Sequence, residues 1–186
     1  MFIKLLRVNT MKRIFTILIL VSTILFSCGP TYTYQKFYNT HKNDIGSTAF
    51  QMPRFMANVI GSLSPEANSF FSNMTDFSFI TLNNVNASNH QILNTEINLI
   101  GNSSHYKDIF RKTEENKRIV VIGKEFDGIV KELVYFNYKD NTVFSFYLKG
   151  SFDSNKIKEL SEKDEFENFT QKLLLQQPKL IPNSIQ

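Results

Sequence analysis

Apolar residues recur along the chain with two different periods, and this pattern predicts the order of its elements. The run from 14 to 26 is uncharged. Helical spacing of apolar residues follows over 53–62 and again over 88–100. From 106 to 152 the pattern changes to short apolar runs separated by turn residues, which is typical of strands. Two further amphipathic helices are expected after Asp153, which is placed to cap the first of them.

The apolar runs also predict how the strands pair. Ile119 to Ile122 is unbroken and apolar, which predicts a central strand buried on both faces. Asp127-Gly128 favours a type I′ turn, so the strands on either side of it form a hairpin. Alternate residues from Phe144 to Leu148 share one face of the last strand. Strands are expected at 77–82, around Ile109 and Phe110, and at 118–126, 130–138 and 142–152.

These elements predict an α+β fold in one domain, residues 48–175. We expect a mainly antiparallel sheet of about five strands that ends in a C-terminal meander, with the helices packed on one sheet face. The helix over 88–100 lies between two strands and is the expected crossover connection. Pro178 is expected to end the last helix. Residues 176–186 are therefore expected to form a flexible tail.

The first residues of the chain have the organisation of a secretory signal. Met11-Lys12-Arg13 is basic, and the uncharged run of 14–26 after it is thirteen residues long. That length suits the apolar part of a signal peptide, whereas a membrane-spanning helix needs about 20 residues. We therefore expect residues 1–27 to be a signal peptide, with Met1 and Met11 both available as the true start.

The end of this run resembles a bacterial lipoprotein signal. Leu25, Ser27 and Cys28 match its leucine, its small residue and the cysteine that is lipidated, although Phe26 is bulkier than the usual occupant. The resemblance implies a covalent lipid on Cys28 as the only attached group. It also implies stable anchoring in the bacterial cell envelope, facing the periplasm from the outer or the inner membrane, because two or more acyl chains hold a protein stably.

Two other interpretations of the first residues remain open. Cys28 could be a buried thiol in a core helix. Alternatively, the apolar run could be an N-terminal membrane-spanning anchor that extends upstream, although Lys4 and Arg7 interrupt that extension.

Residues 28–47 are polar and lack a period, which predicts a tether between the lipid and the domain. Four aromatic residues in this stretch have three open interpretations: contact with the membrane interface, pairing with a sheet edge, or simple exposure. They are Tyr32, Tyr34, Phe37 and Tyr38.

Charge changes the picture once the signal is removed. The whole chain carries 21 basic and 17 acidic residues, a net charge of +4. Residues 1–27 contain four basic residues and no acidic one, so 17 of each sign remain and the net charge is zero. A nucleic-acid partner, which needs a clustered basic surface, is therefore not expected. A single cysteine also excludes an intrachain disulfide and a zinc site built from several cysteines.

Three segments of the meander are similar to a known family, the small lipoproteins of Bacteroidota that are classed as a domain of unknown function. They run from Arg118 to Gly123, from Ile129 to Phe136 and from Phe146 to Asp153, within a resemblance that covers roughly residues 45–162. The strand that ends in Gly150 before Phe152-Asp153 is the most distinctive part. The family implies export, lipid anchoring and an α+β domain, and it brings no known activity or site residues.

The sequence contains none of the common catalytic motifs. Nucleotide-binding, nucleophile-elbow and zinc-protease motifs do not occur. His41, His90 and His105 lie far apart and lack ligand spacing, so no catalytic, cofactor or metal residues are predicted. The charged stretches at Glu114-Glu115 and 162–167 are interpreted as a turn and a solvated helix face.

The expected function is that of a membrane-anchored exported lipoprotein. We expect a non-catalytic binding or envelope-associated module and not an enzyme, with the membrane as a partner through the lipid anchor and an envelope protein as a candidate partner. The 18 Phe residues and the absence of Trp leave a carrier of an apolar ligand in a Phe-lined cavity as an alternative. A second alternative is a hydrolase whose site is assembled from distant residues.

Overall fold

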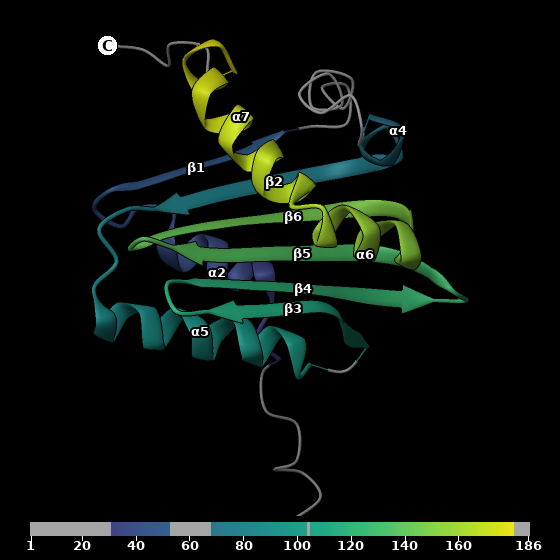
Figure 1. Ribbon diagram of the computed structural model, residues 1–186, viewed down its shortest axis with the longest axis horizontal. Coiled ribbons are helices and arrows are strands. Elements are labelled where there is room, and N and C mark those ends of the chain that lie inside the picture. The colour runs from purple at the N-terminus through teal and green to yellow at the C-terminus, as the bar shows by residue number, and fades with distance from the viewer. Residues whose placement is uncertain (1–30, 53–67, 104, 181–186) are drawn as a thin grey trace, which may run out of the picture. The chain divides into compact units, whose positions relative to one another are not determined.

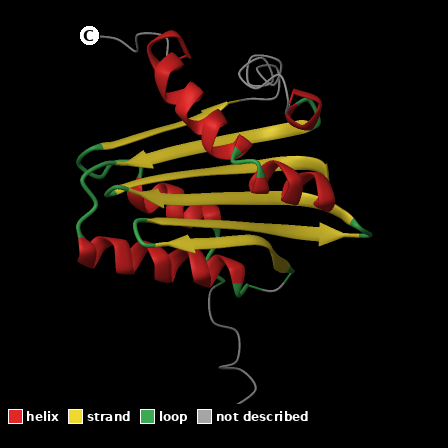
Figure 2. Cartoon of the chain, in the orientation of Figure 1, coloured by secondary structure: helices red, strands yellow, loops and turns green. Residues whose placement is uncertain are grey.

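The computed structural model describes residues 31–52, 68–103 and 105–180. A single sheet of six strands lies at its centre, in the order β1-β2-β6-β5-β4-β3 (Figures 1 and 2), and neighbouring strands are all antiparallel. The strands are β1 (Ser47–Met52), β2 (Met74–Leu82), β3 (Tyr106–Glu114), β4 (Lys117–Phe126), β5 (Ile129–Lys139) and β6 (Thr142–Asp153). The described helices are α2 (Tyr34–His41), α4 (Asn68–Phe71), α5 (Ala87–Gly101), α6 (Ser154–Glu162) and α7 (Glu165–Leu180).

The α+β fold with an antiparallel sheet is thus confirmed, with six strands where about five were expected. The additional strand is β1, which pairs with β2 from Ser47 against Leu82 to Met52 against Phe77. Its sequence is short and is only partly buried, so it carries little of the alternation that marks a strand. The helix expected over 53–62 lies outside the described residues.

Helices cover both faces of the sheet, so the expectation of helices on one face was wrong. The helices α4, α6 and α7 pack on one face, which we call the α7 face, and α2 and α5 pack on the other, the α5 face. Figure 1 shows α6 and α7 in front of the sheet and α2 behind it. The reason lies in the strands: Ile119 and Val121 point to the α7 face while Val120 and Ile122 point to the α5 face, and both apolar sets need cover.

The C-terminal meander has the predicted hairpins. Asp127 and Gly128 have φ values of 50° and 76°, as a type I′ turn requires. A second turn of the same kind, at Asp140 and Asn141, joins β5 to β6. Asp153 caps α6 by accepting a hydrogen bond of 2.8 Å from the backbone N–H of Lys156. The Asp127-Gly128 turn and the Asp153 cap were therefore predicted correctly, and the second turn lies in the gap between the strands expected at 130–138 and 142–152.

Part of the expected tether is folded. Residues 34–41 form α2, which is capped by Thr33. Tyr34, Phe37 and Tyr38 on this helix are all buried against the α5 face. These aromatic residues are core residues of the domain, and none of the three interpretations considered for them describes this position.

Two helix ends differ from the sequence-based expectation. The α5 helix begins at Ala87 and is capped by Asn86, whereas the apolar pattern placed its start at residue 88. The α7 helix continues to Leu180, beyond the expected end at Pro178. Among the described residues, none of the helices has both the length and the apolar character that a membrane crossing requires.

Candidate functional site

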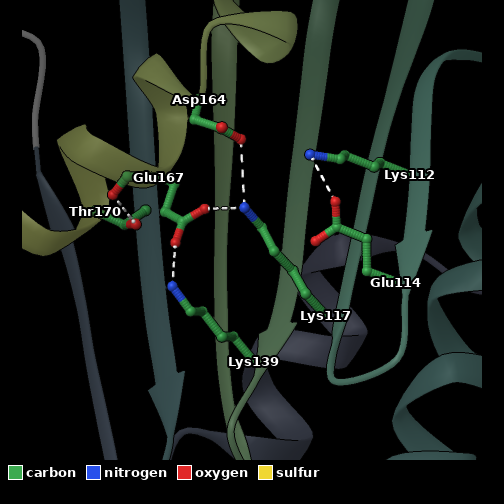
Figure 3. A network of polar contacts seen from close by, with 7 residues as sticks. All are labelled: Lys112, Glu114, Lys117, Lys139, Asp164, Glu167 and Thr170. Carbon is green, nitrogen blue, oxygen red and sulfur yellow. Dashed lines mark hydrogen bonds and ion pairs between the residues drawn. The ribbon is translucent and has the colours of Figure 1, made fainter.

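A cluster of charged side chains lies beneath α7, at the end of the sheet where β4 begins and β5 ends (Figure 3). The carboxylate of Glu167 pairs with Lys117 through one oxygen and with Lys139 through the other, at 2.9 Å for Lys139. Lys117 also lies 3.3 Å from the carboxylate of Asp164. Only 9% of the Glu167 side chain and 14% of the Lys117 side chain are exposed, so this is a sheltered network.

Local sequence explains how these groups meet. Lys117 lies two positions before Ile119 and Lys139 two positions after Asn137, so the strand period turns both lysines toward the α7 face. Lys117 and Lys139 are also register partners across β4 and β5. Glu167 lies in the first turn of α7, where an acidic side chain is favoured by the helix dipole.

The electrostatics hold both partners in their charged forms. Burial alone would raise the pKa of Glu167, but hydrogen bonds from Lys117 and Lys139 outweigh it and lower the pKa. Burial likewise opposes the charge of Lys117, and its carboxylate partners nevertheless raise its pKa. A general acid or base needs a pKa near the working pH. The arrangement is therefore suited to fastening α7 to the sheet and not to proton transfer.

Sequence reasoning missed this cluster. The stretch 162–167 was interpreted as a solvated helix face, and that interpretation was wrong for Glu167, which is buried. The available signal was its position next to Phe166 and three residues before Thr170, both of which are core residues. Glu114, from the other charged stretch, pairs with Lys112 at 2.9 Å near the β3–β4 turn and is exposed, as expected (Figure 3).

Buried polar atoms extend this cluster along the α7 face. Asn137 is fully buried, and both atoms of its carboxamide lack a hydrogen-bond partner among the described residues. The same is true of the Tyr135 hydroxyl. Burial raises the pKa of Tyr135, and the charge of Glu167 raises it further. The tyrosine is therefore neutral at physiological pH.

A second feature is a pocket of about 190 Å³ between the end of α2 and the start of α5. Two exposed apolar side chains, Ile45 and Ile92, line it together with the side chains of Asn83, Asn84 and Asn89. Pockets for small molecules are typically about 300–1,000 Å³. A space of this size accommodates a group about as large as one amino-acid side chain.

His41 is one of the residues that line this pocket, and it joins α2 to α5. Its Nδ1 is 2.7 Å from Asp44 and its Nε2 is 2.7 Å from Glu96. Burial alone would lower the pKa of His41, but hydrogen bonds to the two carboxylates outweigh it and raise the pKa. In the protonated form both ring nitrogens donate to these carboxylates, so the ring has no free lone pair for a metal ion.

The numerous Phe residues are packed into the core. Phe71 and Phe169 stack with ring centroids 4.3 Å apart, and Tyr135 and Phe146 stack at 4.8 Å. Ten Phe side chains in the described part of the chain are buried, these three included. No Phe lines the pocket beside His41. These observations lend no support to a Phe-lined cavity for an apolar ligand.

The sequence-predicted lipidation residue, Cys28, lies outside the described residues. The three histidines are separated as expected: His90 stacks on Tyr138 at 3.6 Å between ring centroids, and His105 is exposed. Within residues 31–52, 68–103 and 105–180, no group of three or more His, Cys, Asp or Glu side chains is placed to hold a metal ion.

Comparison with known proteins gives one result. No curated protein and no solved structure matches the chain. The model of one protein family does match, over residues 38–160, and its description is Domain of unknown function (DUF4252). This match begins within α2 and ends within α6, so it covers all six strands. The chain therefore belongs to the family of proteins with the domain of unknown function DUF4252.

Proposed function

We propose that this chain is an exported lipoprotein, anchored in the bacterial envelope through a lipid on Cys28, and that its domain is a non-catalytic binding module facing the periplasm. The anchor rests on one observation in the sequence: a basic segment, an uncharged run and the Leu25–Cys28 motif follow one another in the order that a lipoprotein signal requires. Lipid attachment at this point is the step on which localisation depends.

The binding role rests on the pocket beside His41. Ile45 is fully exposed and Ile92 is about half exposed, and both lie at the same small opening. Apolar side chains that gather around a hollow rimmed by polar groups are typical of protein contact sites. The asparagine carboxamides of the rim supply both donors and acceptors, which suits a protein partner with a backbone or side chain that enters the pocket.

Anchoring is tested by replacing Cys28 with Ser and following the incorporation of labelled palmitate and the membrane fraction. We expect both to be lost in Cys28→Ser. Membrane association and labelling that persist in the variant would overturn the anchor.

The binding role is tested by crosslinking in intact cells with the anchored protein. We expect Ile45→Asn and Ile92→Asn to remove the same envelope protein from the crosslinked products. Leu175→Asn is the matched control and should leave the crosslinks unchanged, because it replaces an apolar residue on α7 whose exposure lies between those of Ile45 and Ile92. Crosslinks that survive both isoleucine variants would contradict this use of the pocket.

A further inference from the structure

A row of polar side chains lies between α5 and the sheet, and none of its members lines the pocket beside His41. The three residues on α5 follow one another at intervals of four, so they share one helix face. They lie opposite three residues on the α5 face of the sheet. We call this row the α5 seam, and its members are His90, Asn94 and Asn98 on α5 and Tyr138, Arg118 and Arg111 on β5, β4 and β3.

Two arginines converge in the seam on one oxygen atom. Arg111 Nη1 donates to Asn98 Oδ1 at 3.1 Å, and Arg118 Nη2 donates to the same oxygen at 3.3 Å. Two like charges that share one neutral acceptor repel one another, and a counter-charge stabilises such a pair. Two guanidinium groups therefore lie close together, and the group that lies between them is the neutral side-chain amide of Asn98.

The counter-charge is present for one of the arginines only. Asp108 pairs with Arg111, with Nε to Oδ2 at 2.7 Å and Nη2 to Oδ1 at 2.9 Å. For Arg118, no carboxylate lies within ion-pair distance in the part of the chain that the structure describes. Burial lowers the pKa of Arg118 and the charge of Arg111 lowers it further. Arg118 thus keeps four N–H donors for another acceptor, since Asn98 takes one.

The neighbouring side chains favour the same kind of ligand. His90 lies over the ring of Tyr138 and accepts a hydrogen bond of 2.7 Å from the Asn94 side chain. Burial lowers the pKa of His90, and the charge of Arg118 lowers it further. The carboxamide oxygen of Asn94 is buried and has no partner among the described residues. A nearby anion would favour the protonated ring of His90. After rotation of the Asn94 amide, its oxygen accepts a hydrogen bond from the Nε2–H of that protonated ring.

We propose that the α5 seam is a binding site for a phosphate group, with Arg118 as its main ligand. The charges match: two arginines and Asp108 sum to +1, protonation of His90 adds one more, and a phosphate group carries about −1.5 to −2 at neutral pH. The planar guanidinium donates two parallel hydrogen bonds to phosphate oxygens, which a lysine cannot do. Arg111 strengthens the local positive field, and Asn98 holds both guanidinium groups in place.

The proposal is tested on the full-length protein in detergent, with inorganic phosphate as the probe. The ring signal of His90 in a ¹H–¹³C NMR spectrum, assigned with His90→Gln, reports on the seam. We expect a saturable shift and a higher pKa of His90 on addition of phosphate, and a response at least about tenfold weaker with acetate or chloride at equal ionic strength.

Variants separate the seam from general surface charge. Arg118→Gln is expected to weaken phosphate binding by about tenfold or more, whereas Lys172→Gln, which removes one exposed positive charge on α7, should change it by less than about twofold. Circular dichroism checks that Arg118→Gln is folded. If it is not, Arg118→Lys decides the question, because it keeps the charge without the planar fork and should bind several-fold more weakly.

The source of the phosphate is distinguished by a second probe. Phosphatidylglycerol is added to the detergent micelles in place of phosphate, and phosphatidylcholine, whose head group is zwitterionic, is the control lipid. An Arg118-dependent response to phosphatidylglycerol together with none to free phosphate would assign the site to a lipid head group, and the reverse would assign it to a soluble ligand. No saturable response to any phosphate probe, or one that survives in Arg118→Gln, or wild-type affinity in a folded Arg118→Lys, would overturn the proposal.

Discussion

Nε2 of His41 lies 2.7 Å from Oε2 of Glu96, and this contact ties the first described helix to the crossover helix α5. Only 12% of the His41 side chain and 17% of the Glu96 side chain are exposed. The pair therefore belongs to the packing between α2 and α5 and not to the surface. It gives the domain a stability that depends on pH.

His41→Gln should destabilise the protein most in mildly acidic solution. The fold raises the pKa of His41 above 6.5, so this contribution is complete below pH 6.5 and is lost as the pH rises through the raised value. The fold lowers the pKa of Glu96 below 4.5, so its contribution is complete above pH 4.5 and is lost as the pH falls through the lowered value. We expect a loss of about 1–3 kcal/mol between these limits and a smaller loss near pH 9.

Urea unfolding of the wild-type protein and of His41→Gln, once between pH 4.5 and 6.5 and once near pH 9, measures this difference. Asn43→Gln, an exposed substitution two residues away, is the control and should show no such dependence. A loss of equal size at both pH values would show that the pair does not work as described.

Glu167→Gln should cost about 2–3 kcal/mol of unfolding free energy, because it leaves two lysine ammonium groups beneath α7 without their shared carboxylate. Glu162→Gln is the matched control, since its partner Lys158 lies 3.9 Å away and both side chains are more than half exposed. That control should cost less than about 0.5 kcal/mol. Thermal unfolding of the two variants measures the contrast, and similar losses would contradict the buried role of Glu167.

Gly150→Ala should destabilise by about 1–3 kcal/mol, because an added Cβ would overlap the backbone oxygen of Asn73 and lie 2.7 Å from the ring of Phe152. Gly128→Ala tests a different cause. Its site is open, but its φ of +76° costs a residue with a side chain about 1–2 kcal/mol. A double-mutant cycle distinguishes the two causes: Phe152→Leu, which removes a buried ring, should cost less stability in Gly150→Ala than in the wild-type protein, and the same in Gly128→Ala as in the wild-type protein. Denaturant midpoints of the single and double variants measure this.

Asn137→Val should stabilise the protein by about 1 kcal/mol. The carboxamide is fully buried without a hydrogen-bond partner among the described residues, and a β-branched side chain suits a strand. Ser145→Ala, at a position equally buried on β6, should have the opposite sign, since the hydroxyl of Ser145 donates to the Tyr135 carbonyl at 2.7 Å. A loss of stability in Asn137→Val, seen by calorimetry, would mean that the carboxamide has a partner such as a buried water.

The sequence was most informative where a residue pattern is compatible with only one local structure. The unbroken apolar run from Ile119 to Ile122 predicted a strand that is buried on both faces of the sheet. Asp127-Gly128 predicted the turn that follows this strand. Because a strand with apolar residues on both faces needs helices on both, this run also implied cover on each face of the sheet. The expectation of helices on one face overlooked that implication.

Long-range pairings were harder to predict. The strand β1 depends on β2 for its hydrogen bonds, and α2 depends on the α5 face for burial of Tyr34 and Phe37. Neither segment has a regular spacing of apolar residues that would predict its structure from the sequence. The clusters around Glu167 and Arg118 likewise join residues from different elements, so only the fold brings their charges together.

The strand order has a consequence for the order in which the protein can be assembled. The last strand, β6, lies between β2 and β5, so the C-terminal part of the sequence occupies the middle of the sheet. A ribosome completes β1, β2 and α5 long before it reaches Thr142, and until then β2 lacks the neighbour that joins it to the meander. Such distant pairings form late and slowly. A nascent chain that stops before β6 would therefore lack the centre of its sheet and not merely one edge.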